Sequence, residues 1–294
     1  MRLPFIVRAP LSALALVPVA LVGACDVLGI PRELDIPIPL DTPPVDIDVT
    51  VAVASAVEQA CSDPTAPSCE GIGLICQADN GGTVCDPVDL PEQFPKECPN
   101  LRGETVSADE LMPEEVKDAA ELKFAIPVNI ADLLSAQGVT SADQVKQISF
   151  SKVDLSWEEN SLTFDAPVFD VYVGPHVDDV SDPAALIAGG EFARVGSVGK
   201  DLDDDGDFDV GQVAGVADAV PLTFVTGGND AFNEALRAFT FTLVLAAPDG
   251  QALGLKEIPN TDPVEVARPG GVATVKLKSE LSFKVNLVEA LSDK

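Results

Sequence analysis

The chain is poor in the residues on which many enzymes and sugar-binding proteins depend. Its 294 residues include one histidine, one tryptophan and one tyrosine. A single histidine disfavours histidine-based catalysis, and no two cysteines have the C-x-x-C spacing of a zinc site. Sugar binding is disfavoured as well, because its usual stacking platforms are tryptophan and tyrosine rings.

Positive charge is also scarce. Lysine and arginine total 18 against 48 aspartates and glutamates, which gives a formal net charge of −30. Because a field of this sign repels phosphate backbones, we expect no nucleic-acid partner, and cations or proteins with basic patches are favoured instead. Hydrophobic residues make up 46% of the chain, which is enough to build a folded core despite the charge.

The N-terminal apolar segment is too short to form a stable membrane span. Residues 9–24 are uncharged and follow Arg2 and Arg8, but a spanning helix needs about 20 apolar residues. The segment ends in Leu21-Val22-Gly23-Ala24-Cys25. These features together predict an export signal that is removed from the mature chain.

Residues 21–25 resemble the lipobox of bacterial lipoproteins. This resemblance implies removal of residues 1–24, acylation of Cys25 with palmitate-type chains, and anchoring to a membrane of the cell envelope, facing the periplasm or the exterior. It leaves open which membrane holds the protein. A plain secretory signal, cleaved at a nearby small residue without lipid attachment, is the alternative.

Alternation of apolar and polar residues predicts most of the fold. It is clearest at 273–287, where apolar residues occupy mostly odd positions, and it also predicts a strand at 45–53. Residues 34–40 alternate too, but Pro37 and Pro39 lack a backbone N–H, so we expect an edge strand or an extended tether there. Further strands are expected at 122–130, at 148–157 with a bulge between Phe150 and Val153, at 168–173 and at 239–245.

Helical patterns are short by comparison. They cover 113–121 and 131–136, and a third helix is expected after Asn229 as its N-cap. The fold class is therefore mainly β: an antiparallel β-sandwich or partly closed barrel with a few short peripheral helices. Residues 25–44 are expected to form the acylated tether or edge strand, and residues 45–294 a single domain.

Five cysteines gather in one loop-rich segment, 61–98, which predicts a disulfide-rich insertion in an exported chain. If Cys25 is acylated, two bridges and one free thiol remain in this segment; otherwise six cysteines can form three bridges. The candidates are Cys61, Cys69, Cys76, Cys85 and Cys98.

The acidic loop, which we define as residues 200–212, is the most chemically specific segment. Six aspartates lie within the nine residues 201–209, and their mutual repulsion disfavours an ordered loop unless a cation or a raised pKa offsets it. The segment resembles the D-x-D-x-D-G calcium loop of EF-hands, dockerins and thrombospondin type 3 repeats. A solvated, mobile acidic loop is the alternative.

The resemblance implies a structural calcium site with Gly206 at its sharp turn. Gln212 stands where an EF-hand has a bidentate glutamate, which should lower the affinity, and the flanks at 195–199 and 213–216 look like strand or loop rather than helix. The implied ligands are the carboxylates of Asp201, Asp203 and Asp205, the backbone carbonyl of Asp207, Asp209 directly or through water, and Gln212.

Catalytic signals are weak. His176 lies in a turn-like Gly-Pro-His context without a nucleophile motif, and the acidic pairs 158–159 and 178–179 are expected to be solvated charges. We therefore expect a non-catalytic, membrane-anchored binding or envelope-structural module. Two alternatives stay open: a carrier of an apolar ligand or lipid in a barrel cavity, and a hydrolase whose carboxylates meet only in the folded chain.

Overall fold

The structure is a computed structural model, which describes residues 33–63, 65–77, 90–99, 102–120, 122–136, 139, 145–248 and 254–286. The predicted fold class is confirmed. The protein is mainly β, with a strongly curled antiparallel half-barrel sheet and short helices. Among the described residues, no helix is both long and apolar enough to cross a lipid bilayer. The predicted leader, residues 1–24, and Cys25 lie outside these residues.

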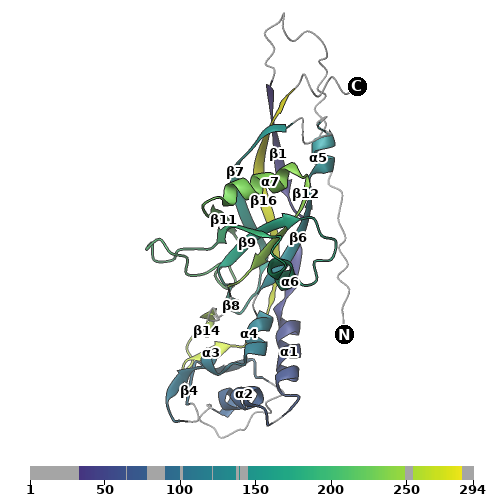
Figure 1. The fold of residues 1–294 in the computed structure, drawn as a ribbon. Helices are drawn as coiled ribbons and strands as arrows, with labels where there is room; N and C mark the ends of the chain where they lie inside the picture. The colour runs from purple at the N-terminus through teal and green to yellow at the C-terminus, as the bar shows by residue number, and fades with distance from the viewer. Residues whose placement is uncertain are drawn as a thin grey trace, which may run out of the picture.

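Nine strands form the main sheet (Figure 1). Eight of them follow the order β1-β16-β7-β11-β10-β9-β12-β6, and β2 continues the line of β1 along β16. Their bounds are β1 (Glu33–Asp41), β2 (Val45–Asp48), β6 (Lys123–Asn129), β7 (Val145–Asn160), β9 (Phe169–Pro175), β10 (Ala193–Val198), β11 (Ala219–Phe224), β12 (Thr240–Ala246) and β16 (Val272–Asn286).

The two longest strands, β7 and β16, form the centre of one half of this sheet. In β16 the odd-numbered side chains from Ala273 to Phe283 are buried and the even-numbered ones are not, as the alternation predicts. The predicted bulge is confirmed: the register shifts where Glu280 pairs with Lys152 and Leu281 with Phe150, which leaves Ser151 as the extra residue. The strands predicted at 34–40, 122–130, 168–173 and 239–245 are also confirmed, as β1, β6, β9 and β12.

Buried side chains from neighbouring strands meet on one face of the sheet. Leu155 lies in register with Leu277 on one side and Val220 on the other, and all three are almost completely buried. Aromatic rings continue this core, because the ring of Phe169 lies 5.8 Å from that of Phe124 and 6.3 Å from that of Trp157, between ring centroids. Packed side chains therefore occupy the interior of the curled sheet around Leu155 and Phe169.

Short helices and small sheets cover the rest of the core (Figure 1). The helices α1 to α4 gather at the lower end of the view, and α7 lies against the sheet, where Phe232 contacts Phe224 and Phe241. The helices are α1 (Val49–Ala60), α2 (Pro67–Gln77), α3 (Ala108–Leu111), α4 (Glu114–Ala120), α5 (Ala131–Ala136), α6 (Pro183–Ala188) and α7 (Gly228–Arg237). The small strands are β3 (Gln93–Pro95), β4 (Glu97–Pro99), β5 (Thr105–Ser107), β8 (Phe164–Asp165), β13 (Gly254–Leu255), β14 (Glu257–Ile258) and β15 (Glu265–Ala267).

Two local predictions are wrong. The strand predicted at 45–53 ends at Asp48, whose carboxylate accepts a hydrogen bond from the Val51 amide and caps α1. The predicted N-cap of α7 is also wrong, since Gly227 in a left-handed conformation precedes the helix and Asn229 lies inside it. The helices predicted at 113–121 and 131–136 are confirmed as α4 and α5.

The cysteine-rich segment is more regular than predicted, because α2 occupies 67–77. Cys61 at the end of α1 and Cys69 in α2 form a disulfide, with their Cα atoms 4.6 Å apart. Cys98 is free and buried, and its thiol donates to the Pro95 carbonyl at 3.6 Å. Burial raises the pKa of the Cys98 thiol to about 11, which makes it unreactive at neutral pH. The Cys76 side chain and Cys85 lie outside the described residues.

Candidate functional site

The acidic loop connects β10 to β11, two antiparallel neighbours in the sheet. Its two ends are joined by a bridge between Lys200 and Val210: the Lys200 amide donates to the Val210 carbonyl at 2.6 Å, and the Asp209 amide donates to the Lys200 carbonyl at 2.9 Å. The nine residues 201–209 therefore emerge from a closed neck. This agrees with the expectation that the flanks are strand or loop rather than helix.

Three of the predicted ligands converge within this loop. Carboxylate oxygens of Asp201, Asp203 and Asp209 all lie within 4.8 Å of one another. Asp203 and Asp209 are exposed and Asp201 is half-buried. The group is of the kind that can hold a metal ion, although exposed acidic groups of this kind are common without one.

Backbone amides of the loop point at these carboxylates. The Gly206 amide donates to Asp201 Oδ2 at 2.8 Å, and the Leu202 amide donates to Asp209 Oδ2 at 2.7 Å. The hydrogen bond from Gly206 is the main cause that lowers the pKa of Asp201, so this carboxylate stays ionised at neutral pH. Gly206 has a φ of 100°, which is consistent with its predicted place at the sharp turn.

The side chains of Asp205, Asp207 and Gln212 are not part of this group of carboxylates. Asp205 Oδ1 accepts from the Asp207 amide at 2.9 Å, and both residues are exposed. Gln212 is completely buried at the base of the loop, where its Nε2 donates to Asp218 Oδ1 at 2.5 Å and its Oε1 accepts from the Val213 amide at 3.1 Å. Both polar ends of the Gln212 side chain are therefore engaged away from the three carboxylates.

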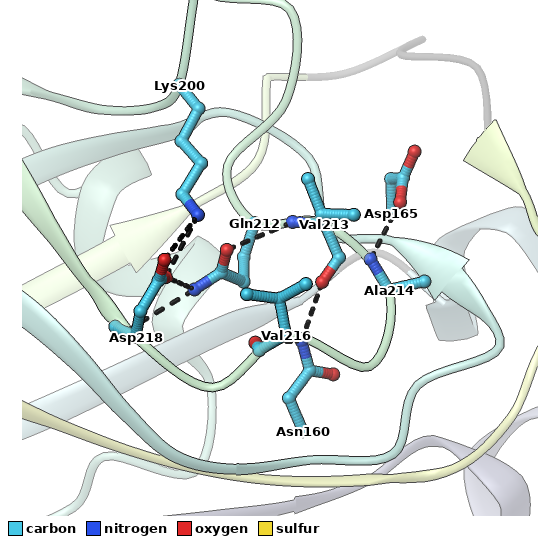
Figure 2. A network of polar contacts seen from close by, with 8 residues as sticks. All are labelled: Asn160, Asp165, Lys200, Gln212, Val213, Ala214, Val216 and Asp218. Carbon is cyan, nitrogen blue, oxygen red and sulfur yellow. Dashed lines mark hydrogen bonds and ion pairs between the residues drawn. The ribbon is translucent and has the colours of Figure 1, made fainter. Parts of the chain in front are cut away.

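The base of the loop is held by a network of polar contacts (Figure 2). Lys200 Nζ lies 2.9 Å from each carboxylate oxygen of Asp218, which also accepts from Gln212. On the other side, Asn160 Nδ2 donates to the carbonyls of Val213 at 3.0 Å and Val216 at 2.9 Å. Asp165 Oδ1 accepts from the Ala214 amide at 2.7 Å. Because Asn160 is the last residue of β7 and Asp165 the last residue of β8, both strands hold the segment that follows the loop in place.

The charge of Asp218 is stabilised by its partners. Burial raises the pKa of Asp218, but the hydrogen bonds from Gln212 and Lys200 outweigh this effect and leave the pKa below its usual value. Asp218 therefore stays ionised well below neutral pH and keeps Lys200 at the neck. Asp218, Asn160 and Asp165 were not predicted from the sequence, because none of them belongs to a motif. Asn160 and Asp165 also contact residues about 50 positions away in the sequence.

We expect Gln212→Leu to lower the free energy of unfolding by about 1 to 3 kcal/mol. The substitution leaves the Val213 amide without its side-chain acceptor and removes one donor from Asp218 in a buried place. Denaturant unfolding followed by circular dichroism measures the change. Gln93→Leu is the matched control at an exposed position and should change stability by less than about 0.5 kcal/mol. Equal effects of the two variants would contradict a supporting role for Gln212.

The weak catalytic candidates have other interaction partners, although Glu158 lies only two residues before Asn160. His176 Nε2 lies 3.4 Å from Oδ1 of the fully exposed Asp178. Glu158 forms an ion pair with Lys276, and the hydrogen bond from Lys276 is the main cause that lowers the pKa of Glu158. A glycosidase needs a carboxyl group whose pKa is raised so that it can act as the acid, and Glu158 is shifted in the opposite direction.

Comparison with known proteins adds no family to these observations. No protein-family model, curated protein or solved structure matches the chain.

Proposed function

We propose that the protein is a non-catalytic, lipid-anchored β module of the bacterial cell envelope, in which calcium rigidifies the acidic loop for structural or binding purposes. The observation that supports this proposal best is the convergence of Asp201, Asp203 and Asp209 on a loop whose neck is closed by the Lys200–Val210 bridge. A fixed neck reduces the number of loop conformations that a cation has to order, and so favours binding.

Calcium is the cation that this arrangement favours. Carboxylate and carbonyl oxygens are its usual ligands, and three like charges within 4.8 Å repel one another until a cation neutralises them. Outside the cytoplasm, even a site with a dissociation constant near ~10⁻⁴ M fills with calcium. A shallow site of this strength is what an exposed loop without a bidentate glutamate would provide.

The filled core supports a binding or structural module over a carrier of apolar ligands. A carrier needs a cavity lined by apolar side chains, whereas Phe124 and Trp157 both pack against Phe169 inside the curled sheet. The partner that we propose is a protein with a basic patch, because the net charge of −30 favours cationic surfaces.

The calcium part of this proposal is tested by thermal unfolding with excess calcium and with chelator. At a calcium concentration one hundred times the dissociation constant, binding contributes about 2.7 kcal/mol, which corresponds to a rise in Tm of roughly 5 to 10 °C for a domain of this size. Asp201→Asn with Asp203→Asn should abolish most of this rise. At position 203 asparagine keeps the oxygen that accepts from the Asp205 amide, so mainly charge is lost there. At position 201 it keeps only one of the two oxygens that accept from the Asp205 and Gly206 amides.

A matched control removes the same charge from the same loop. Asp204→Asn with Asp207→Asn changes two aspartates outside the converging group and should keep most of the calcium-dependent rise in Tm. If the unaltered protein unfolds at the same temperature with calcium and with chelator, calcium has no structural role here. If both double variants lose the rise equally, the effect is one of general loop charge rather than of a defined site.

A further inference from the structure

A curled sheet that does not close leaves two edges, and one of them is formed by β1 and β2. Both strands pair with β16 on one side, and among the described residues no strand pairs with their other side. Backbone N–H and C=O groups on such an edge can pair with a strand from another molecule. The residues at the outward-facing backbone positions therefore decide whether this edge can bind one.

The hydrogen bonds of the edge show which backbone groups face outward. The Thr42 amide donates to the Leu277 carbonyl at 3.0 Å, so the even-numbered residues of β1 direct their backbone groups to β16 and the odd-numbered ones direct theirs away. In β2 the parity is reversed, because the Val49 amide donates to the Gly271 carbonyl at 3.0 Å. The outward positions are Asp35, Pro37, Pro39 and Asp41 in β1 and Asp46 and Asp48 in β2, with Glu33 at the start of β1.

Every one of these positions holds proline or an acidic residue. Pro37 and Pro39 have no N–H to offer at the centre of β1, and both are exposed. Asp41, Asp46 and Asp48 are exposed as well and place negative charge beside the remaining outward amides. The intervening Ile38 and Leu40 are buried, so the alternation that builds the core also places proline and aspartate on the edge.

The opposite edge of the sheet, formed by β6, also has a proline at an outward-facing position. The Ile130 amide donates to the Phe239 carbonyl at 2.8 Å, so the odd-numbered residues of β6 direct their backbone groups away from β12. These outward positions include Lys123 and the exposed Pro127. Both edges of the open sheet thus carry proline where a further strand would need a donor.

We propose that the β1–β2 edge is guarded against strand addition by a second copy of the chain, and that Pro37 and Pro39 are the principal guards. The proposal goes beyond the proposed function and does not depend on the lipid anchor or on calcium. Such a guard would allow an open nine-stranded sheet to persist as a single molecule. An acyl anchor would make such a guard more important, because it raises the local concentration of copies on a membrane.

The test is sedimentation velocity of the double variant Pro37→Thr with Pro39→Thr. Threonine suits a strand and restores two outward donors, each of which is used in both copies of an antiparallel dimer. We expect the unaltered protein to stay monomeric and the variant to associate at least about tenfold more strongly. The matched control, Pro43→Thr with Pro44→Thr, removes two prolines between β1 and β2 and should stay monomeric.

Folding of each variant is checked by near-UV circular dichroism. A folded double variant that remains monomeric at the highest concentration reached would overturn the proposal, as would an unaltered protein that already dimerises through β1. If the double variant does not fold, the single variant Pro39→Thr replaces it under the same criterion. Failure of both to fold would mean that the prolines serve to form β1 rather than to guard it, which also overturns the proposal.

Discussion

Cys25→Ser is expected to abolish acylation of the protein and, with it, stable attachment to the membrane. Each buried methylene of an acyl chain contributes about 0.8 kcal/mol to membrane binding, and one chain alone holds a protein only marginally. The two or three chains that the lipobox resemblance implies would hold it durably. Because every chain depends on the thiol of one residue, a single substitution removes the whole anchor.

Incorporation of labelled palmitate and the intact mass of the purified protein measure this effect. The unaltered protein should take up label and have the mass of residues 25–294 plus its acyl groups, whereas Cys25→Ser should take up none. Cys98→Ala is the control, because it removes another cysteine that is buried in the folded domain, and it should keep the label. An unaltered chain that begins at Met1 without added mass would exclude the lipoprotein proposal.

The long strands were the most predictable part of the fold. Alternation with a period of two identified β16 and β7, because apolar and polar residues alternate along both strands and a shift of one residue would reverse every side chain. The bulge at Ser151 was predictable for the same reason, since an extra residue moves the apolar side chains from even-numbered positions before it to odd-numbered positions after it. Strand β10 was expected only as strand or loop because Gly196 lies within it, and β11 was not predicted because Pro221 argues against a central strand.

The segment that follows β2 shows why such patterns fail locally. Val49, Val51 and Val53 continue the alternation of Val45 and Ile47, and valine favours strands. However, Val49, Val53, Ala56, Val57 and Ala60 recur at helical spacing, and α1 buries all five. A window that ended at residue 53 could not distinguish the two periods, whereas the alanine-rich continuation and the cap at Asp48 favour the helix.

The candidate site was predictable in composition but not in geometry. The resemblance to a calcium loop implied six ligands from Asp201 to Gln212, and among their carboxylates those of Asp201, Asp203 and Asp209 converge. The difference arises at the base, where Gln212 is drawn to Asp218 and the following turn to Asn160 and Asp165. These partners lie in other strands or across the turn, so no local motif could have revealed them.

Phe169→Ala is expected to lower the free energy of unfolding by about 3 to 5 kcal/mol, the largest effect of a single core substitution that we predict. Phe169 is completely buried and its ring packs against those of Phe124 and Trp157, so alanine leaves a cavity that three strands line. A loss of this size corresponds to a decrease in Tm of roughly 6 to 20 °C for a domain of this length.

The same substitution should also loosen the base of the acidic loop. A Cβ atom on Gly211 would lie 3.2 Å from the Phe169 ring and even closer to the Pro167 carbonyl, so the ring is a near neighbour of the Gly211 backbone. The Gly211 amide donates to the Ala166 carbonyl at 2.7 Å. Amide hydrogen exchange should therefore be faster at Gly211 in Phe169→Ala. Val264→Ala, at a position that is 45% exposed, is the control and should change stability by less than about 0.5 kcal/mol. If Phe169→Ala lowers stability but leaves exchange at Gly211 unchanged, the core and the loop are held independently, and the packing of Phe169 does not position the candidate site.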